Sequence, residues 1–174
     1  MAPRGAGISR GVTRYLTNLE VAELDELFLL AFHAVEGIRQ RASVGRALHA
    51  VKVPPRLSEG IVVNHCRDVF RSATQVAARR PPHDVTLRTH RRLNVAVKGS
   101  GLTDWAVITT ADRQADVLVW VDYRDRLLDP AAPVLVRRIR IAALAPDRNR
   151  AFLRALCADV TAVAVHPGRP RTPL

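Results

Sequence analysis

The sequence predicts a mixed α/β fold built on one central sheet. Three observations carry this prediction. Apolar residues recur at helical spacing in the N-terminal third, and four later segments have the alternating or continuous apolar pattern of strands. The third observation is the order of elements, which is helix, helix, strand, strand, short helical turn, strand, strand, helix. With 174 residues, the chain is long enough for one globular domain with a substantial core.

The N-terminal third is predicted to be a helical addition to that domain. Residues 1–16 are rich in Gly and Arg and are expected to form a flexible basic arm. The string TNLE has the form of a capping box, with Thr17 at the cap and Glu20 three residues later. A helix should run to about Gln40, and residues 17–55 then form the addition. Its broad apolar face would comprise Leu24, Leu27, Phe28, Phe32, Val35 and Ile38.

Residues 56–165 are predicted to form the core of the domain. A second helix should begin after Ser58 as cap and end near Ala78. The strings DVTLRT, LNVAVK, ADVLVWVDY and VLVRRIRI are the predicted strands, with GSG at 99–101 as a turn. ADVLVWVDY is apolar enough for burial on both faces, whereas VLVRRIRI suits a place nearer an edge. Residues 146–165 are expected to be a closing helix, and 166–174 a disordered tail.

The first two predicted strands place an acid near a lysine. Because side chains alternate across a strand, the odd-numbered positions of both strands are apolar and the even-numbered positions share the opposite face. A hairpin centred on Arg91 would set Asp84 directly across from Lys98, where side chains approach within about 5 Å. A slip of two residues would leave the two as diagonal neighbours. The alternative interpretation of Lys98 is an exposed strand end.

A third charged group comes from the second helix. Its inward stripe is predicted to run Val62, Cys66, Val69, Ala73, Val76, and Glu59 lies one step earlier on that stripe. Glu59 should therefore point at the sheet, although an acid in the first turn also suits the helix dipole. Carboxylates beside a lysine suit metal-assisted phosphodiester cleavage, since carboxylates hold Mg²⁺ and an ammonium stabilises phosphate charge. The chain has 25 Arg and two Lys, so the lysine at this position is a departure from its general usage.

These motifs resemble those of the PD-(D/E)XK nucleases, which have the restriction-endonuclease-like fold. RLSEGIVVNHC supplies Glu59, PPHDVTL supplies Asp84, NVAVKGSG supplies Lys98, and DWAVITTADRQADVLVWVDY is similar to the family's short helix and buried strand. The resemblance covers roughly residues 56–123. It implies an α/β mixed sheet flanked by helices and a metal-dependent DNA endonuclease. Glu59, Asp84 and Lys98 would be the catalytic residues, with Mg²⁺ or Mn²⁺ held by Glu59 and Asp84.

One position departs from the family pattern. The acid of its acid-x-lysine motif should stand two residues before Lys98, where this chain has Ala96. No glutamate follows Glu59 in the sequence, so no downstream Glu can substitute. Either Glu59 completes the metal site with Asp84, or the protein is a non-catalytic DNA-binding or assembly subunit on a nuclease-like fold. A third interpretation is an unrelated regulatory or interaction protein.

The charge balance is compatible with a nucleic-acid partner. The formal net charge is +11, which suits a polyanion such as duplex DNA, although a compositional excess of Arg explains it equally well. Phosphate contacts are expected first from Arg79, Arg80, Arg91 and Arg92, at the strand entry and hairpin tip. No apolar run approaches the roughly 18 residues of a membrane span, so we expect no membrane contact and a cytoplasmic location. The sequence leaves open whether the chain forms a homodimer.

Overall fold

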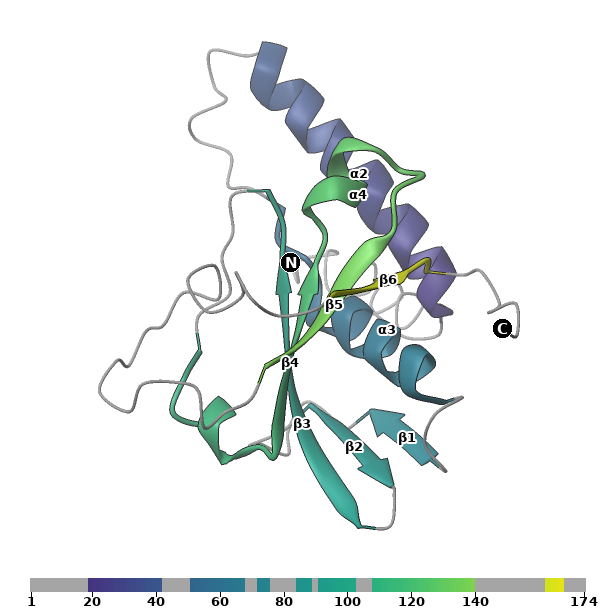
Figure 1. Ribbon diagram of the computed structural model, residues 1–174. Helices are drawn as coiled ribbons and strands as arrows, with labels where there is room; N and C mark the ends of the chain where they lie inside the picture. Colours follow the sequence, from purple (N-terminus) through teal and green to yellow (C-terminus); the bar gives the residue numbers. More distant parts are fainter. Residues whose placement is uncertain are drawn as a thin grey trace, which may run out of the picture.

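A six-stranded mixed sheet organises the protein (Figure 1). The computed structural model describes residues 19–41, 51–67, 72–75, 84–88, 91–102, 108–139 and 162–167. The strands follow one another across the sheet in chain order. They are β1 (Ser72–Gln75), β2 (Val85–Arg88), β3 (Arg92–Ser100), β4 (Val117–Asp122), β5 (Val134–Ile139) and β6 (Ala162–Val165). The prediction of a mixed α/β structure is confirmed.

The centre of the sheet is a parallel pair. β3 and β4 run parallel, with Lys98 beside Trp120 and Ser100 beside Asp122, while every other neighbouring pair is antiparallel. All six residues of β4 are buried, which confirms the prediction that this strand is covered on both faces. The carboxyl ends of β3 and β4 therefore lie side by side, and polar groups at the two ends can meet there.

Helix α3 (Pro55–Arg67) covers one face of the sheet (Figure 1). Its residues Leu57, Ile61 and Val62 are almost fully buried in a core shared with the odd-numbered residues of the strands. Those strand residues are Val85, Leu87, Val95, Val97, Val117, Val119 and Val121. The predicted division of the hairpin into an apolar face and an opposite polar face is confirmed for these positions.

Helix α3 differs from its prediction at both ends. It begins at Pro55, a residue suited to the first helical turn, and the Ser58 hydroxyl donates to the Pro55 carbonyl instead of capping the helix. It ends at Arg67, and residues 72–75, which were expected to continue the helix, form strand β1. Pairing with β2 gives these residues the backbone hydrogen bonds that the helix would have supplied. The part of the predicted stripe at Val69 and Val76 lies outside the described residues.

The hairpin register is shifted by two residues from the predicted one. Val85 pairs with Val95 and Arg88 with Arg92, so the turn is centred on residue 90 and not on Arg91. Asp84 consequently lies beside Ala96, and Lys98 is its diagonal neighbour. The shifted register places two arginines, Arg88 and Arg92, directly across from each other at the end of the ladder.

The predicted turn at GSG is wrong, because β3 continues through Gly99 and Ser100. The parallel neighbour β4 extends to Asp122 and supplies partners for both residues. The start of α3 and the residue Val53 just before it also lie close to β3 at Gly99. A Cβ at this position would lie 3.1 Å from Val53 Cγ1 and 3.3 Å from Ser58 Cβ.

The prediction of a closing helix is also wrong for its C-terminal part. Residues 162–165 form β6, which pairs antiparallel with β5 at one edge of the sheet. The string AVAV fits an edge strand as well as a helix, and the pairing with β5 decides between them. Residues 146–161 lie outside the described residues. Strand β5 is therefore one strand in from the edge, and its pattern is mixed as expected.

Helix α2 (Val21–Arg41) is fastened to the short helix α4 (Arg124–Leu128). Arg126 donates to Asp25 through Nε and Nη2, with the shortest contact at 2.6 Å, and both residues are buried. Phe28 packs edge-on against Tyr123 at 5.6 Å between ring centroids. Leu24, Phe28 and Phe32 are buried as predicted, whereas Leu27 and Ile38 are exposed.

None of the helices in the described ranges is long and apolar enough to cross a membrane.

Candidate functional site

Lys98 forms an ion pair with a residue that the sequence analysis did not select. Its Nζ lies 2.8 Å from Asp112 Oδ1. Asp112 begins the short 3-10 helix η2 (Asp112–Gln114), which precedes β4. The Lys98 side chain is 23% exposed and that of Asp112 is 8% exposed, so the pair lies at the margin of the covered region. It is on the sheet face opposite α3, because Lys98 alternates with Val97, which is in the core, and with Gly99, which lies against Val53 and Ser58.

The Asp112 carboxylate is held in place by its own turn. Asp112 Oδ2 accepts hydrogen bonds from the Thr109 backbone N–H at 2.6 Å and from the Thr109 hydroxyl at 2.8 Å. These bonds leave Oδ1 directed at Lys98. Asp112 was not predicted, because only glutamate was considered as a substitute acid after Lys98. The available signal was an aspartate in the short helical turn just before the buried strand.

Asp84 lies on the other side of β3. Its backbone N–H donates to the Val95 carbonyl, and its Oδ2 accepts the Val97 backbone N–H at 2.7 Å. The side chain therefore ends the β2–β3 ladder in place of a backbone carbonyl and is half-buried next to Ala96. Among the described residues, no donor reaches its other oxygen, Oδ1.

Ala96 occupies the position where the family pattern has an acid. It is fully buried in β3, between the neighbouring strands β2 and β4. Lys98 and Asp84 are not within ion-pair distance, so the ammonium group faces Asp112 in this structure. The charged groups Asp84, Lys98 and Asp112 thus come from the start of β2, the second half of β3 and the turn before β4.

Glu59 is part of helix α3. It is half-buried in α3 and follows Ser58, whose Cβ lies close to Gly99. Gly99 is next to Lys98 but faces the other side of the sheet. Glu59 therefore belongs to the helix on the opposite face of the sheet from Lys98.

Trp120 fills the sheet face beside Lys98. Its Nε1–H donates to the Ser100 hydroxyl at 2.7 Å, and the ring is 2% exposed. The guanidinium groups of Arg124 and Arg137 lie 5.8 Å and 5.6 Å from the ring centroid. Two guanidinium groups therefore lie near the carboxyl ends of β3 and β4, and that of Arg124 is also paired with Asp122.

The arginines expected to contact phosphate are only partly described. Arg91 and Arg92 are exposed at the hairpin tip, as is Arg88, which pairs directly with Arg92 across the two strands. Arg79 and Arg80 lie outside the described residues. Like charges directly opposite each other repel, so binding of an anion at the hairpin tip would be favourable.

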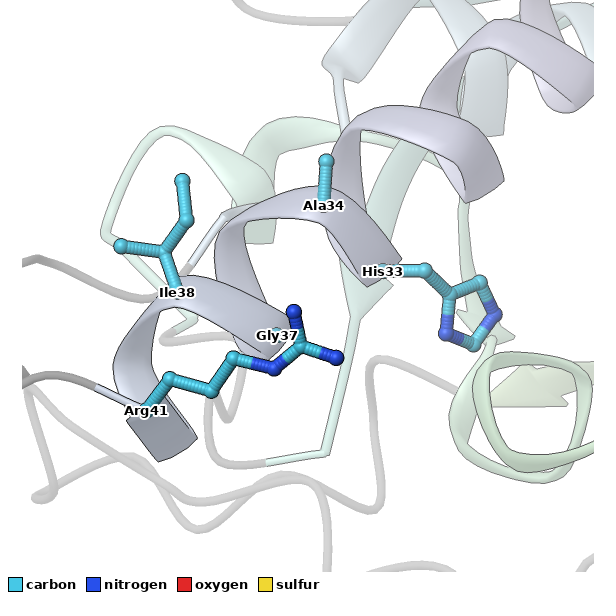
Figure 2. Close-up of a pocket in the computed structure, with 5 residues that line it drawn as sticks. All are labelled: His33, Ala34, Gly37, Ile38 and Arg41. Atoms are coloured by element: carbon cyan, nitrogen blue, oxygen red, sulfur yellow. The ribbon is translucent and has the colours of Figure 1, made fainter.

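A separate hollow lies along one side of α2 (Figure 2). It is lined by His33, Ala34, Gly37, Ile38 and Arg41, all from that helix. Figure 2 shows the His33 and Arg41 side chains extending from the helix without converging on one point. The hollow contains none of the acidic residues or lysines of the site described above.

Comparison with known protein families gave no match for this chain, and comparison with curated proteins gave none either.

Proposed function

We propose that this protein is a metal-dependent endonuclease with a restriction-endonuclease-like fold, acting on duplex DNA. The observation that carries the proposal is the position of Asp84. A carboxylate at the start of β2 is docked on the Val97 backbone N–H of β3, one residue from Lys98. The order of α3, β2, β3, η2 and β4 along the chain also agrees with the order of the motifs that suggested this family.

The donor set is compatible with Mg²⁺ or Mn²⁺. Mg²⁺ in nucleotide-cleaving enzymes takes one or two protein carboxylates and completes its shell with water and phosphate oxygens. Asp84 has one oxygen that no described donor engages, and it would be the first ligand. Glu59 is the second ligand expected from the sequence. The described residues contain no cluster of three or more acidic, His or Cys side chains that would form a closed metal cage.

The reaction is hydrolysis of a phosphodiester bond. Water adds to phosphorus, the bond from phosphorus to the leaving oxygen breaks, and the proton given up by the water balances the one that the leaving oxygen acquires. A bound divalent ion would neutralise phosphate charge and lower the pKa of water. Lys98 would place an ammonium group beside the phosphate, where its compact charge stabilises the added negative charge.

The hairpin tip would supply part of the DNA contact. Arg88, Arg91 and Arg92 are exposed there, and the repulsion between the paired Arg88 and Arg92 would be relieved by a phosphate group. Binding to duplex DNA should then weaken steeply with salt, since each neutralised phosphate releases counterion. The double variant Arg91→Glu, Arg92→Glu should bind less tightly and show a smaller salt slope.

The test is cleavage of supercoiled plasmid and linear duplex DNA with Mg²⁺, Mn²⁺ or EDTA. We expect cleavage with either metal and none with EDTA. Asp84→Asn and Lys98→Met should each reduce the rate by about 100-fold or more, since each removes a charge from the reacting centre. Asp129→Asn is a matched control in an exposed turn after α4. Cleavage in EDTA, or full activity of Asp84→Asn, would contradict the proposal.

The second candidate is a DNA-binding or assembly subunit without catalysis. Ala96 favours it, because an alanine replaces the acid of the motif and cannot hold a metal. In that case the wild-type protein would bind duplex DNA with a steep salt dependence. It would not cut the DNA, whichever divalent ion is added. The same plasmid assay, run beside a binding titration, therefore separates the two candidates.

A further inference from the structure

Position 96 lacks an acid, and the structure brings a different acid to the same lysine. Asp112 follows Lys98 by 14 residues in sequence (112 − 98 = 14), yet its Oδ1 lies 2.8 Å from Lys98 Nζ. Both side chains are on the face of the sheet that Ala96 also occupies. We infer that Asp112 joins Asp84 as a metal-binding carboxylate of the site and takes over the role of the acid missing at position 96. This inference rests on the proposed nuclease function.

The way Asp112 is held supports a ligand role. Two donors from Thr109 fix Oδ2, so the carboxylate cannot rotate freely and presents Oδ1 on the Lys98 side. The side chain is only 8% exposed, and burial of an acid at this depth needs compensation from hydrogen bonds or charge. A carboxylate that is already oriented loses little freedom when it binds an ion.

Turn formation alone does not explain the contact with Lys98. The Thr109 hydrogen bonds account for Oδ2, and they would form equally well without any partner for Oδ1. Two other aspartates flank β4 and serve as comparisons. Asp116 accepts the Asn94 backbone N–H and is exposed, and Asp122 is paired with Arg124 two residues later. Of these three aspartates, Asp112 is the one that meets Lys98.

Asp112 and Asp84 flank Lys98 from opposite sides of β3. Asp84 is fixed to β3 at Val97 from the β2 side, and Asp112 comes from the segment that leads into β4. Lys98 is diagonal to the ladder position of Asp84 and contacts Asp112. In this arrangement the ammonium group stands where it competes with a divalent ion for the Asp112 carboxylate. Removal of its charge should therefore strengthen ion binding, whereas removal of either carboxylate charge should weaken it.

The experiment measures Mn²⁺ binding by calorimetry and plasmid cleavage in parallel on the full chain. We expect Asp112→Asn to weaken Mn²⁺ binding by at least about tenfold, because even loss of a group that only supports a metal ligand costs about 10- to 100-fold. Cleavage should fall by about 100-fold or more. Asp116→Asn is the matched control: it changes an aspartate of the same segment whose Oδ2 accepts the Asn94 backbone N–H of β3, and it should keep both properties.

Two further variants keep the inference testable if Asp112→Asn folds poorly. Lys98→Met should bind Mn²⁺ several-fold more tightly than the wild type while losing cleavage. The double variant Ala96→Glu, Asp112→Asn moves the acid to the family position and should recover Mn²⁺ binding and part of the cleavage. Unchanged Mn²⁺ affinity in Lys98→Met would overturn the inference, as would a double variant that folds but recovers nothing.

The outcomes separate this inference from the proposed function. If the wild type cuts DNA with Mg²⁺ and Asp112→Asn cuts equally well, the nuclease proposal stands and the role of Asp112 is overturned. If Asp112→Asn loses cleavage but binds Mn²⁺ like the wild type, Asp112 only positions Lys98, and the inference is again overturned. If the wild type neither binds Mn²⁺ nor cuts DNA, both proposals are overturned.

Discussion

Two ion pairs of the protein, Arg126–Asp25 and Lys98–Asp112, each join an aspartate to a cation of another element but differ in their surroundings. Arg126–Asp25 joins helices α4 and α2, with side chains 10% and 1% exposed. Lys98–Asp112 lies beside the sheet, with side chains 23% and 8% exposed. The first pair connects residues 101 apart in sequence, and both side chains are buried. The second lies at the margin of a covered region.

The cations of these two pairs differ in how many of their N–H donors have a protein acceptor. The Arg126 guanidinium also donates to the carbonyls of Pro130 and Ala132 at 2.9 Å and 2.8 Å, so its donors are directed at four fixed protein oxygens. Lys98 has three N–H donors and one carboxylate partner in the described structure. A fully engaged, enclosed pair fixes the fold. A partly engaged pair at a margin can exchange its partner for a ligand at little cost.

The largest effect that follows from this comparison is the loss of stability on breaking the enclosed pair. Arg126→Ala would leave the Asp25 carboxylate buried without its cation, and two carbonyls would lose their donor. We expect the free energy of unfolding to fall by about 3–5 kcal/mol. Denaturant unfolding monitored by circular dichroism measures it. A change below about 1 kcal/mol would mean that the two pairs do not differ as described.

Lys98→Met should have a much smaller effect on stability. The lysine head group is partly exposed, and the Asp112 carboxylate keeps two hydrogen bonds from Thr109 when the cation is removed. The expected cost is about 1 kcal/mol or less. The same unfolding experiment measures it, and a cost comparable to that of Arg126→Ala would indicate that Lys98 is a structural residue.

Tyr123 allows the enclosed region to be tested by pH. Burial raises the pKa of the Tyr123 hydroxyl well above its ordinary value, and the nearby negative charge of Asp25 raises it further. The unfolded state releases this proton at about pH 10, whereas the folded state retains it. The free energy of unfolding therefore has its full value below that pH and falls above it. Tyr123→Phe should lose less stability than the wild type between about pH 9 and pH 11. Parallel pH dependence of the two proteins would contradict this assignment.

The smallest effect is expected for a third pair, Glu36–Arg39 on α2. Their side chains are 34% and 30% exposed, and the residues are three positions apart on one helix. Such pairs contribute about 0.2–0.5 kcal/mol. Arg39→Ala should therefore change the unfolding free energy by no more than this amount. A larger loss would show that this part of α2 has a role in packing beyond the exposed pair.

The sequence predicts best the elements that carry a local periodic signal. Strands β2 to β5 and the burial of β4 follow from alternating or continuous apolar residues, and most of α2 follows from helical spacing. The two edge strands were missed. SATQ and AVAV are compatible with helix or strand, and the neighbouring strand decides their state through backbone pairing. This information is not present in either string alone.

The candidate site was predictable only in part for a similar reason. Asp84 and Lys98 stand out because each occupies a polar position on an alternating strand. Their register depended on the hairpin turn, whose centre falls one residue earlier than expected. The contact between Lys98 and Asp112 depends on a turn without apolar periodicity and on the parallel placement of β3 and β4. Spacing along the chain does not report such a contact.

Trp120 gives the protein an optical reporter at the candidate site. The indole lies beside Lys98 across the β3–β4 ladder, donates to Ser100 and faces two guanidinium groups, so the charges around it are close to the ring. The intensity and wavelength of tryptophan emission respond to local charge and polarity. Trp105 is the other tryptophan in the chain, and replacing it with Phe would leave Trp120 as the single emitter. Occupancy of the region around Lys98 could then be followed by fluorescence, without a label and without turnover.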